Sequence, residues 1–173
     1  YKDKNYPALK NVNLVIKKGR TYGIVGKTGS GKSTLIQILS RQLSVEEQNY
    51  LVDGRTILDF ELSTFRSKIA YVQQDVFLFS ASLKDNILVG AEREVSEKEL
   101  QEVLKLSALD SDLKLFNDGI ETIIGERGVS LSGGQKQRLS LARALLRDAD
   151  IYLLDDCLSA VDAETESKII ENL

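Results

Sequence analysis

The residues with the clearest chemical potential form the run Gly26-Lys27-Thr28-Gly29-Ser30-Gly31-Lys32-Ser33, which fits the pattern G-x-x-x-x-G-K-[ST]. The glycines allow a tight turn in which consecutive N–H groups point at one oxyanion. Lys32 adds a compact positive charge for the β- and γ-phosphates of a nucleotide, and the hydroxyl of Ser33 is placed to ligate Mg²⁺. The pattern therefore predicts a phosphate-binding loop. A glycine- and serine-rich surface turn is the alternative.

The segments on both sides of this loop fit that prediction. Residues 21–25 are predicted to form a buried strand that leads into the loop, and residues 33–39 a helix that follows it. The N-terminus of such a helix presents N–H groups and a partial positive charge to an anion. Upstream, residues 12–16 are predicted to form another strand and residues 17–19 a turn.

Two neighbouring carboxylates end a second apolar run, Ile151-Tyr152-Leu153-Leu154-Asp155-Asp156. Asp155 would lie at the C-terminal tip of a buried strand beside the phosphate loop, where it can hold Mg²⁺ through water, and Asp156 would lie next to the γ-phosphate. The alternative is a pair of N-capping acids before a turn.

A third apolar run, residues 69–72, is predicted to be a buried strand and is followed by Gln73, Gln74 and Asp75. Polar residues at the end of such a strand are well placed for a site in an open α/β sheet. Between the first helix and this run, residues 49–52 are predicted to form a strand and residues 62–68 a short helix.

From residue 75 to residue 130 the pattern is mainly helical. Ser96 and Glu99 form a capping box before an apolar stripe at helical spacing, and a short helix is expected near residues 112–116. The next helix is expected to begin at Ser132, a good N-cap. Gly133 and Gly134 are poor helix formers, and we expect them where an anion approaches the main chain.

Composition excludes several classes of protein. The chain has 173 residues and a net charge of −3, so no global basic field attracts nucleic acid. The longest apolar runs are a few residues, too short for a membrane span or a signal peptide. The sequence contains no histidine and one cysteine, Cys157, which excludes histidine bases and an internal disulfide and fits a reducing compartment.

Taken together, GKTGSGKS at 26–33, Gln74, LSGGQ at 131–135, IYLLDD at 151–156 and SAVD at 159–162 resemble the nucleotide-binding domain of an ABC transporter. The resemblance covers essentially the whole chain. It implies an α/β fold of the P-loop NTPase type, with a mixed sheet flanked by helices and an N-terminal antiparallel β portion. The ATP-binding core would comprise residues 1–74 and 131–173, and residues 75–130 a mainly helical subdomain. The closing strands of the sheet and the switch histidine of the family would lie beyond Leu173, so the resemblance implies a fragment.

The resemblance also implies roles for individual residues, with ATP and Mg²⁺ as cofactors. Tyr1 resembles the aromatic residue that stacks on adenine, and residues 132–135 resemble the signature that closes on ATP held by the opposite subunit. The implied nucleotide contacts are Tyr1, Gly26, Lys27, Thr28, Gly29, Ser30, Gly31, Lys32, Ser33, Thr34, Ser132, Gly133, Gly134, Gln135 and Asp162. The implied magnesium ligands are Ser33, Gln74 and Asp155. The implied catalytic residues are Asp156, Gln74 and Lys32.

One departure from the family pattern concerns catalysis. Members that hydrolyse ATP well carry glutamate where this chain has Asp156, whose carboxylate is one methylene shorter and lies about 1 Å or more further back. An intact LSGGQ with a shortened acid resembles one half of a bacterial heterodimeric multidrug exporter, on the cytoplasmic face of the plasma membrane. The implied partners are a transmembrane domain on the same chain and a second, non-identical nucleotide-binding domain, with no nucleic acid.

Three alternatives stay open at this point. The chain could be an ATP-binding regulatory module with little hydrolysis, or it could resemble the first nucleotide-binding domain of the eukaryotic multidrug-resistance-associated proteins. A soluble ABC ATPase that acts on DNA or ribosomes is disfavoured by the net charge. The segment at 125–128, which resembles the part of exporters that faces the membrane domain, also disfavours it.

Overall fold

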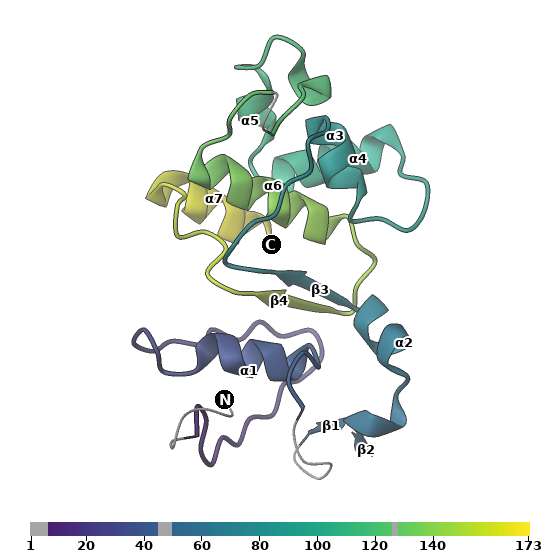
Figure 1. The fold of residues 1–173 in the computed structure, drawn as a ribbon, viewed down its shortest axis with the longest axis vertical. Coiled ribbons are helices and arrows are strands. Elements are labelled where there is room, and N and C mark those ends of the chain that lie inside the picture. Colours follow the sequence, from purple (N-terminus) through teal and green to yellow (C-terminus); the bar gives the residue numbers. More distant parts are fainter. Residues whose placement is uncertain (1–6, 45–49, 126–127) are drawn as a thin grey trace. The chain divides into compact units, whose positions relative to one another are not determined.

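The computed structural model describes residues 7–44, 50–125 and 128–173, and the chain divides into two compact units, residues 1–66 and 67–173 (Figure 1). The first unit contains helix α1 (Lys32–Leu39), strands β1 (Leu51–Val52) and β2 (Arg55–Thr56), the 3₁₀ helix η2 (Ile57–Asp59) and helix α2 (Leu62–Ser67). β1 and β2 pair antiparallel. Asp53 and Gly54 between them both have positive φ, at 49° and 78°, as a two-residue hairpin turn of type I′ requires.

The predicted strands at residues 12–16 and 21–25 are wrong for the described structure, in which neither segment forms regular secondary structure. Their apolar side chains are largely exposed, with Val15 at 75% and Val25 at 97%. A strand forms only when a neighbouring strand accepts and donates its main-chain hydrogen bonds, and neither segment has such a ladder among the described residues. The turn predicted between the two segments is present at residues 18–19.

A two-stranded parallel sheet lies at the base of the second unit. β3 (Ile69–Val72) pairs with β4 (Ile151–Leu154), and the register places Ile69 opposite Ile151 and Val72 opposite Leu154. Both strands were predicted at these residues. Because the strands are parallel and in register, their C-terminal ends lie at the same edge, so the polar residues that follow each strand begin side by side (Figure 1).

The helices of the second unit form its main core. They are α3 (Leu83–Leu88), α4 (Glu97–Leu106), α5 (Asp110–Leu113), the 3₁₀ helix η3 (Gly119–Glu121), α6 (Gly133–Leu145) and α7 (Ala163–Asn172). α6 is central and contacts β3, α3 and α4. The apolar core around it includes Ile87, Leu104 and Leu139, all fully buried. A second cluster joins Leu141 of α6 to Ile169 of α7.

α3 and α6 meet through their main chains. A Cβ atom at Gly90, just after α3, would overlap the carbonyl group of Arg143. The Arg143 guanidinium in turn donates from Nε to the main-chain oxygen of Asn86 at 2.8 Å and from Nη2 to its Oδ1 at 3.1 Å. Glycine at position 90 therefore allows the C-terminal end of α3 to rest directly on the backbone of α6.

The predicted helix starts agree closely with the structure. The predicted capping box of Ser96 with Glu99 is present at α4, and the predicted N-cap Ser132 forms a second capping box with Gln135 at α6. The short helix expected near residues 112–116 is α5, which begins two residues earlier. Within the described ranges, no helix has the length and apolar character needed to cross a lipid bilayer.

The predicted division of the chain into a core and a helical subdomain stays a prediction. Helices α3, α4 and α5 all lie within residues 75–130, the range expected to be mainly helical. The compact units of the structure, however, divide at residues 66 and 67 rather than at residues 74 and 130.

Candidate functional site

The phosphate loop, residues 26–33, is ordered by its own contacts in the first unit. The Nζ atom of Lys32 donates to the main-chain oxygens of Gly26 at 2.8 Å and Lys27 at 3.2 Å. The main-chain N–H of Ser30 also donates to the main-chain oxygen of Lys27, at 3.1 Å. The loop therefore curls around the ammonium group. An anion that drew Lys32 toward itself would replace these two carbonyl contacts with stronger charge-assisted ones.

Two glycines of this loop have close neighbours, and at Gly31 the backbone itself requires glycine. Gly31 caps α1 with φ of 95°, a left-handed conformation that favours glycine, and a Cβ there would lie 2.7 Å from the main-chain oxygen of Ala8. A Cβ at Gly26 would lie 2.6 Å from Oγ of Ser30. An α-helix begins with N–H groups that have no carbonyl partner within the helix, so this end of α1 suits a phosphate.

The C-terminal edge of the β3–β4 sheet gathers the predicted polar residues of the second unit. Asp155 follows β4 directly, is buried, and its N–H donates to the main-chain oxygen of Val72 at 3.0 Å. Nε2 of Gln74 donates to Oδ2 of Asp156 at 3.3 Å. Gln74, which follows β3, thus contacts Asp156 from 82 residues away in the sequence, and Asp155 is the residue next to Asp156 at the same edge.

Tyr71 is a contact of this edge that the sequence analysis did not identify. Its hydroxyl donates to Oδ2 of Asp155 at 3.5 Å. Burial and the nearby charge of Asp155 raise the pKa of Tyr71, so the phenol stays protonated and remains a donor to the carboxylate. A tyrosine inside an apolar strand gives no sequence signal for this role.

Asp156 has an unusual backbone conformation with φ of 53°. Aspartate tolerates this left-handed region better than most residues. Its main-chain oxygen accepts a hydrogen bond from Nε2 of Gln137 at 3.4 Å. The same amide of Gln137 donates to Oγ of Ser159 at 3.0 Å, and its oxygen accepts from the N–H of Ala160 at 2.8 Å. Gln137 therefore joins α6 to the loop of residues 159–162, which we call the D-loop.

Residues 131–135, which we call the signature, begin helix α6. Oγ of Ser132 accepts from the N–H of Gln135 at 3.2 Å, and Oε1 of Gln135 accepts from the N–H of Ser132 at 2.9 Å. Because the Ser132 oxygen is used as an acceptor, its own proton can be donated to an anion at this helix end.

The two signature glycines have a packing role that the sequence did not predict. A Cβ at Gly134 would lie 2.8 Å from the main-chain oxygen of Ala160, and a Cβ at Gly133 would lie 3.1 Å from the Cβ of Ala160. The D-loop of the same chain therefore rests directly on the start of α6. The glycines permit this contact whether or not an anion approaches the helix.

The last D-loop residue caps the helix that follows it. Oδ1 of Asp162 accepts from the N–H of Thr165 at 2.9 Å, and this contact lowers the pKa of Asp162, so the carboxylate is ionised at neutral pH. Burial, by contrast, raises the pKa of Cys157 to about 11, so this thiol is protonated and unreactive at neutral pH.

The structure brings part of the predicted site together. Gln74, Asp155 and Asp156 meet within the second unit, where the signature also contacts the D-loop. The phosphate loop belongs to the first unit, and its approach to the acidic edge stays a prediction. Tyr1 and the central residues of segment 125–128 lie outside the described residues.

The acidic edge fits a magnesium ion that is shared with a phosphate. Among the described residues there is no cluster of three or more acidic, cysteine or histidine side chains that could enclose a metal. Mg²⁺ in nucleotide sites needs no such cluster, because it is held by one or two carboxylates together with phosphate oxygens and water. Asp155, the buried acid at the end of β4, would provide the carboxylate of such a site. Gln74 uses the donor end of its amide on Asp156, so Oε1 is its atom that could ligate a cation.

Comparison with known proteins identifies the family. A family model described as ABC transporter matches residues 9–159. The multidrug resistance-like ATP-binding protein MdlA of Buchnera aphidicola is 44% identical over 173 residues, which is 100% of this chain and 30% of that protein. The probable multidrug resistance ABC transporter ATP-binding/permease protein YheI of Bacillus subtilis is 46% identical over 165 residues, 95% of this chain and 28% of that protein.

Two further relatives extend this result. The ATP-dependent lipid A-core flippase of Salmonella typhimurium is 40% identical over 169 residues, 98% of this chain and 29% of that protein. The solved structure of a bacterial Atm1-family ABC exporter with ATP bound superposes with a TM-score of 0.78 and 34% identity, over 84% of this chain and 26% of that one. The chain spans less than a third of the length of each of these proteins. From its motifs, its fold and these relatives, the chain belongs to the ABC transporter family and corresponds to its nucleotide-binding domain.

Proposed function

We propose that the chain binds Mg²⁺ and ATP and is the ATP-hydrolysing domain of a membrane exporter. The observation that carries the proposal is the meeting of Gln74, Asp155 and Asp156 at one sheet edge, in a chain whose phosphate loop fits the nucleotide-binding pattern. The ATP-bound exporter that the chain resembles supports the choice of nucleotide.

Each group would act on a different part of the nucleotide. Lys32 leaves its two carbonyl contacts and binds the β- and γ-phosphates, while the N–H groups at the start of α1 hold the phosphate oxygens. Ser33, Asp155 and Gln74 would hold the metal, which when bound neutralises charge on the phosphates. Asp156 would accept a hydrogen bond from the attacking water, and its contact with Gln74 links that water to the metal side of the site.

We further propose that hydrolysis at this chain's own site is slow. The carboxylate of Asp156 is one methylene shorter than glutamate, and misplacement of a base by about 1 Å can cost on the order of 100-fold in rate. Asp156 also lies in the left-handed region, and its carboxylate already accepts a hydrogen bond from Gln74.

The proposed assembly is a heterodimer in which the signature of this chain acts on ATP held by a competent partner. The intact signature and the shortened acid support this choice together. The proposed membrane domain lies on the same polypeptide, since one relative is an ATP-binding/permease protein and the chain spans only 28% of it.

A surface of the second unit suits contact with that membrane domain. Phe77 is 69% exposed and packs edge to face with Phe79, with ring centroids 5.0 Å apart. Val89, which follows α3, is also exposed. An adjacent groove of about 270 Å³ is lined by Val76, Leu78, Ile124, Gly125, Val129, Ser130, Leu131 and Lys136. Exposed aromatic side chains beside a groove are typical of a surface that another domain covers.

The experiment that tests the proposal is Asp156→Glu in the full-length transporter assembled with its partner. ATP turnover at this chain's site should rise by about 10- to 100-fold if the short side chain limits it. Asp156→Asn is the matched control, because it keeps the length and removes the base. No rise with Asp156→Glu would refute the shortened acid as the cause. No magnesium-dependent ATPase activity in the assembled transporter would favour the regulatory module instead.

A further inference from the structure

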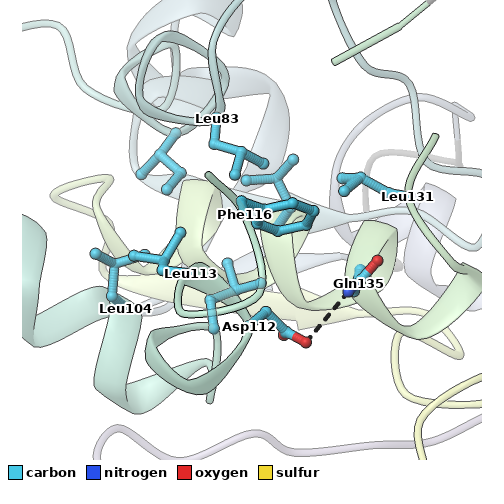
Figure 2. A pocket seen from close by; sticks show the side chains of 10 residues that line it. Leu83, Leu104, Asp112, Leu113, Phe116, Leu131 and Gln135 are labelled. Atoms are coloured by element: carbon cyan, nitrogen blue, oxygen red, sulfur yellow. Dashed lines mark hydrogen bonds between the residues drawn. The ribbon is translucent and has the colours of Figure 1, made fainter. Parts of the chain in front are cut away.

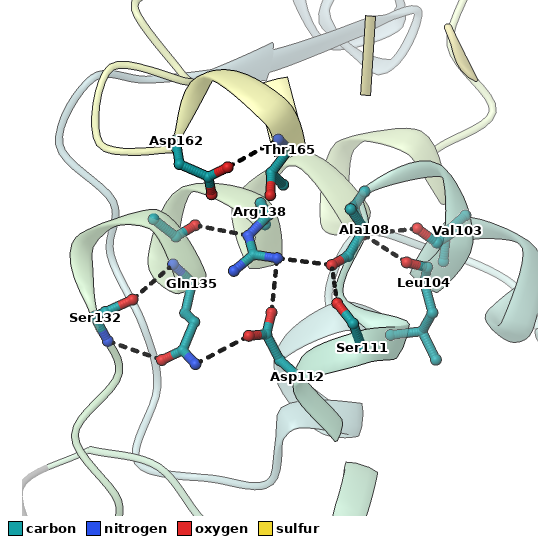
Figure 3. Close-up of polar contacts among 12 residues, drawn as sticks. Val103, Leu104, Ala108, Ser111, Asp112, Ser132, Gln135, Arg138, Asp162 and Thr165 are labelled. Atoms are coloured by element: carbon teal, nitrogen blue, oxygen red, sulfur yellow. Dashed lines mark hydrogen bonds and ion pairs between the residues drawn. The ribbon is translucent and has the colours of Figure 1, made fainter. Parts of the chain in front are cut away.

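Asp112 of α5 contacts the signature through its carboxylate. Its Oδ1 accepts a hydrogen bond from Nε2 of Gln135 at 3.2 Å, and its Oδ2 lies 2.8 Å from Nη1 of Arg138 (Figure 3). Figure 2 shows the same contact at the edge of an apolar cavity, which Leu113, Phe116 and Leu131 line together with Gln135. The cavity between them is about 10 Å³, close to the size of one water and too small for a nucleotide.

This contact fixes the orientation of the Gln135 amide. Its oxygen accepts from the N–H of Ser132, and its nitrogen donates to Asp112, so each end of the amide meets a group of the opposite kind. A rotation of the amide by half a turn would place its oxygen against the carboxylate and its NH₂ against an N–H. The Asp112 carboxylate therefore favours one orientation of the Gln135 amide. In that orientation the amide oxygen holds the main-chain N–H of Ser132.

Arg138 compensates the charge of the buried Asp112 carboxylate. The side chains of Arg138 and Asp112 are only 12% and 11% exposed. Arg138 also donates from Nη1 to the main-chain oxygen of Ala108 at 2.7 Å, just after α4, and from Nε to that of Gly134 at 3.4 Å (Figure 3). The pair thus joins α5 and the end of α4 to the first turn of α6. A charge buried in this way is stable only with its partner present.

We propose that Asp112 is a positioning residue for the signature, which acts through Gln135 to hold Ser132 where it meets the nucleotide of the opposite subunit. The inference rests on the proposed function, because it assigns Ser132 a target in the partner's site. Asp112 itself does not touch the nucleotide. Its loss should therefore lower turnover at the partner's site and leave ATP binding at this chain's own phosphate loop unchanged.

The first test exchanges the hydrogen-bond donor and acceptor between the side chains of Gln135 and Asp112 in the full-length heterodimer. Gln135→Glu places a second carboxylate against Asp112 and should lower kcat by about tenfold or more. Adding Asp112→Asn restores one donor and one acceptor, so the Asp112→Asn/Gln135→Glu double variant should recover most of the lost turnover. A double variant no more active than Gln135→Glu overturns the proposal.

The second test separates positioning from folding. The double variant Asp112→Leu/Arg138→Met removes both charges together, and apolar replacement of a buried ion pair is often neutral for stability. The variant should therefore fold and bind ATP at its own site. Because Gln135 has lost its acceptor, kcat should fall by about tenfold with little change in KM. Retained turnover overturns the proposal.

Two controls distinguish this inference from the proposed function. Steady-state hydrolysis of the heterodimer reports the partner's site, because the site of this chain is expected to be slow. ATP binding by the phosphate loop is followed by photolabelling with an azido-ATP. A wild-type heterodimer without hydrolysis overturns the proposed function and this inference with it. An active wild type whose Asp112 variants are equally active overturns this inference alone.

Discussion

The contact between the signature glycines and Ala160 predicts different outcomes for two adjacent substitutions. Gly134→Ala would place a Cβ 2.8 Å from the main-chain oxygen of Ala160. Gly133→Ala would place a Cβ 3.1 Å from the Cβ of Ala160. An oxygen that belongs to the backbone can move away only if the D-loop moves. Overpacking of this kind costs about 1–3 kcal/mol, and the gain from replacing a helical glycine by alanine is at most about 1 kcal/mol.

The free energy of unfolding is therefore expected to fall for Gly134→Ala and to change little for Gly133→Ala. For Gly134→Ala we expect about 1–2 kcal/mol of destabilisation, which corresponds to a fall in melting temperature of roughly 2–8 °C or more, depending on the size of the cooperative unit. The assay is thermal unfolding of the full-length protein without nucleotide. The absence of nucleotide matters, because an anion-binding role alone would leave this measurement unchanged.

Ala160→Gly provides the matched control for both variants. It removes the Cβ that opposes Gly133 and leaves the main-chain oxygen that opposes Gly134. It should therefore relieve any defect of Gly133→Ala and fail to relieve that of Gly134→Ala. If Gly134→Ala melts at the wild-type temperature without nucleotide, the D-loop does not rest on α6 as described, and the glycine is required only by the ligand.

Two further outcomes follow from buried and capping groups. Glu99 has its pKa lowered from 4.5 to about 2 by hydrogen bonds to Arg93 and Ser96, so its contribution to stability is present above pH 4.5 and is lost as the pH falls toward 2. Glu99→Gln keeps the capping box but should remove this part of the acid dependence, as measured by unfolding between pH 5 and 2. Asn86 is fully buried, and its Nδ2 donates to two main-chain oxygens, both at 3.0 Å. Asn86→Asp replaces this donor by an acceptor and should cost about 2–4 kcal/mol in denaturant unfolding, whereas a surface Asn13→Asp change should cost little.

Local chemistry explains which elements could be predicted from the sequence. The helix starts at Ser96 and Ser132 were predicted correctly because their signals are local, a capping box at Ser96 and a preferred N-cap residue at Ser132. Strands β3 and β4 were predicted because short apolar runs end abruptly in polar residues. The strands expected at residues 12–16 and 21–25 depend on pairing with distant segments, which a local pattern does not contain.

The same distinction applies to the candidate site. Asp155 and Asp156 could be placed from the strand that they end, and Gln74 from the strand before it. Asp112 and Gln137 could not, because their side-chain contacts join residues 19 to 26 positions apart across different elements. The signature glycines were predicted to matter through a ligand, and the structure adds a second reason within the chain itself.

The absence of a side chain at Gly90 has a consequence for how motion passes through the second unit. Side chains between two helices can change rotamer and so absorb a small shift of one helix against the other. Here the end of α3 and the carbonyl of Arg143 are in direct main-chain contact, so no such buffer separates them. A displacement of the exposed surface around Val89 would therefore pass to the helix that begins with the signature through main-chain atoms, and not through side chains that can change rotamer.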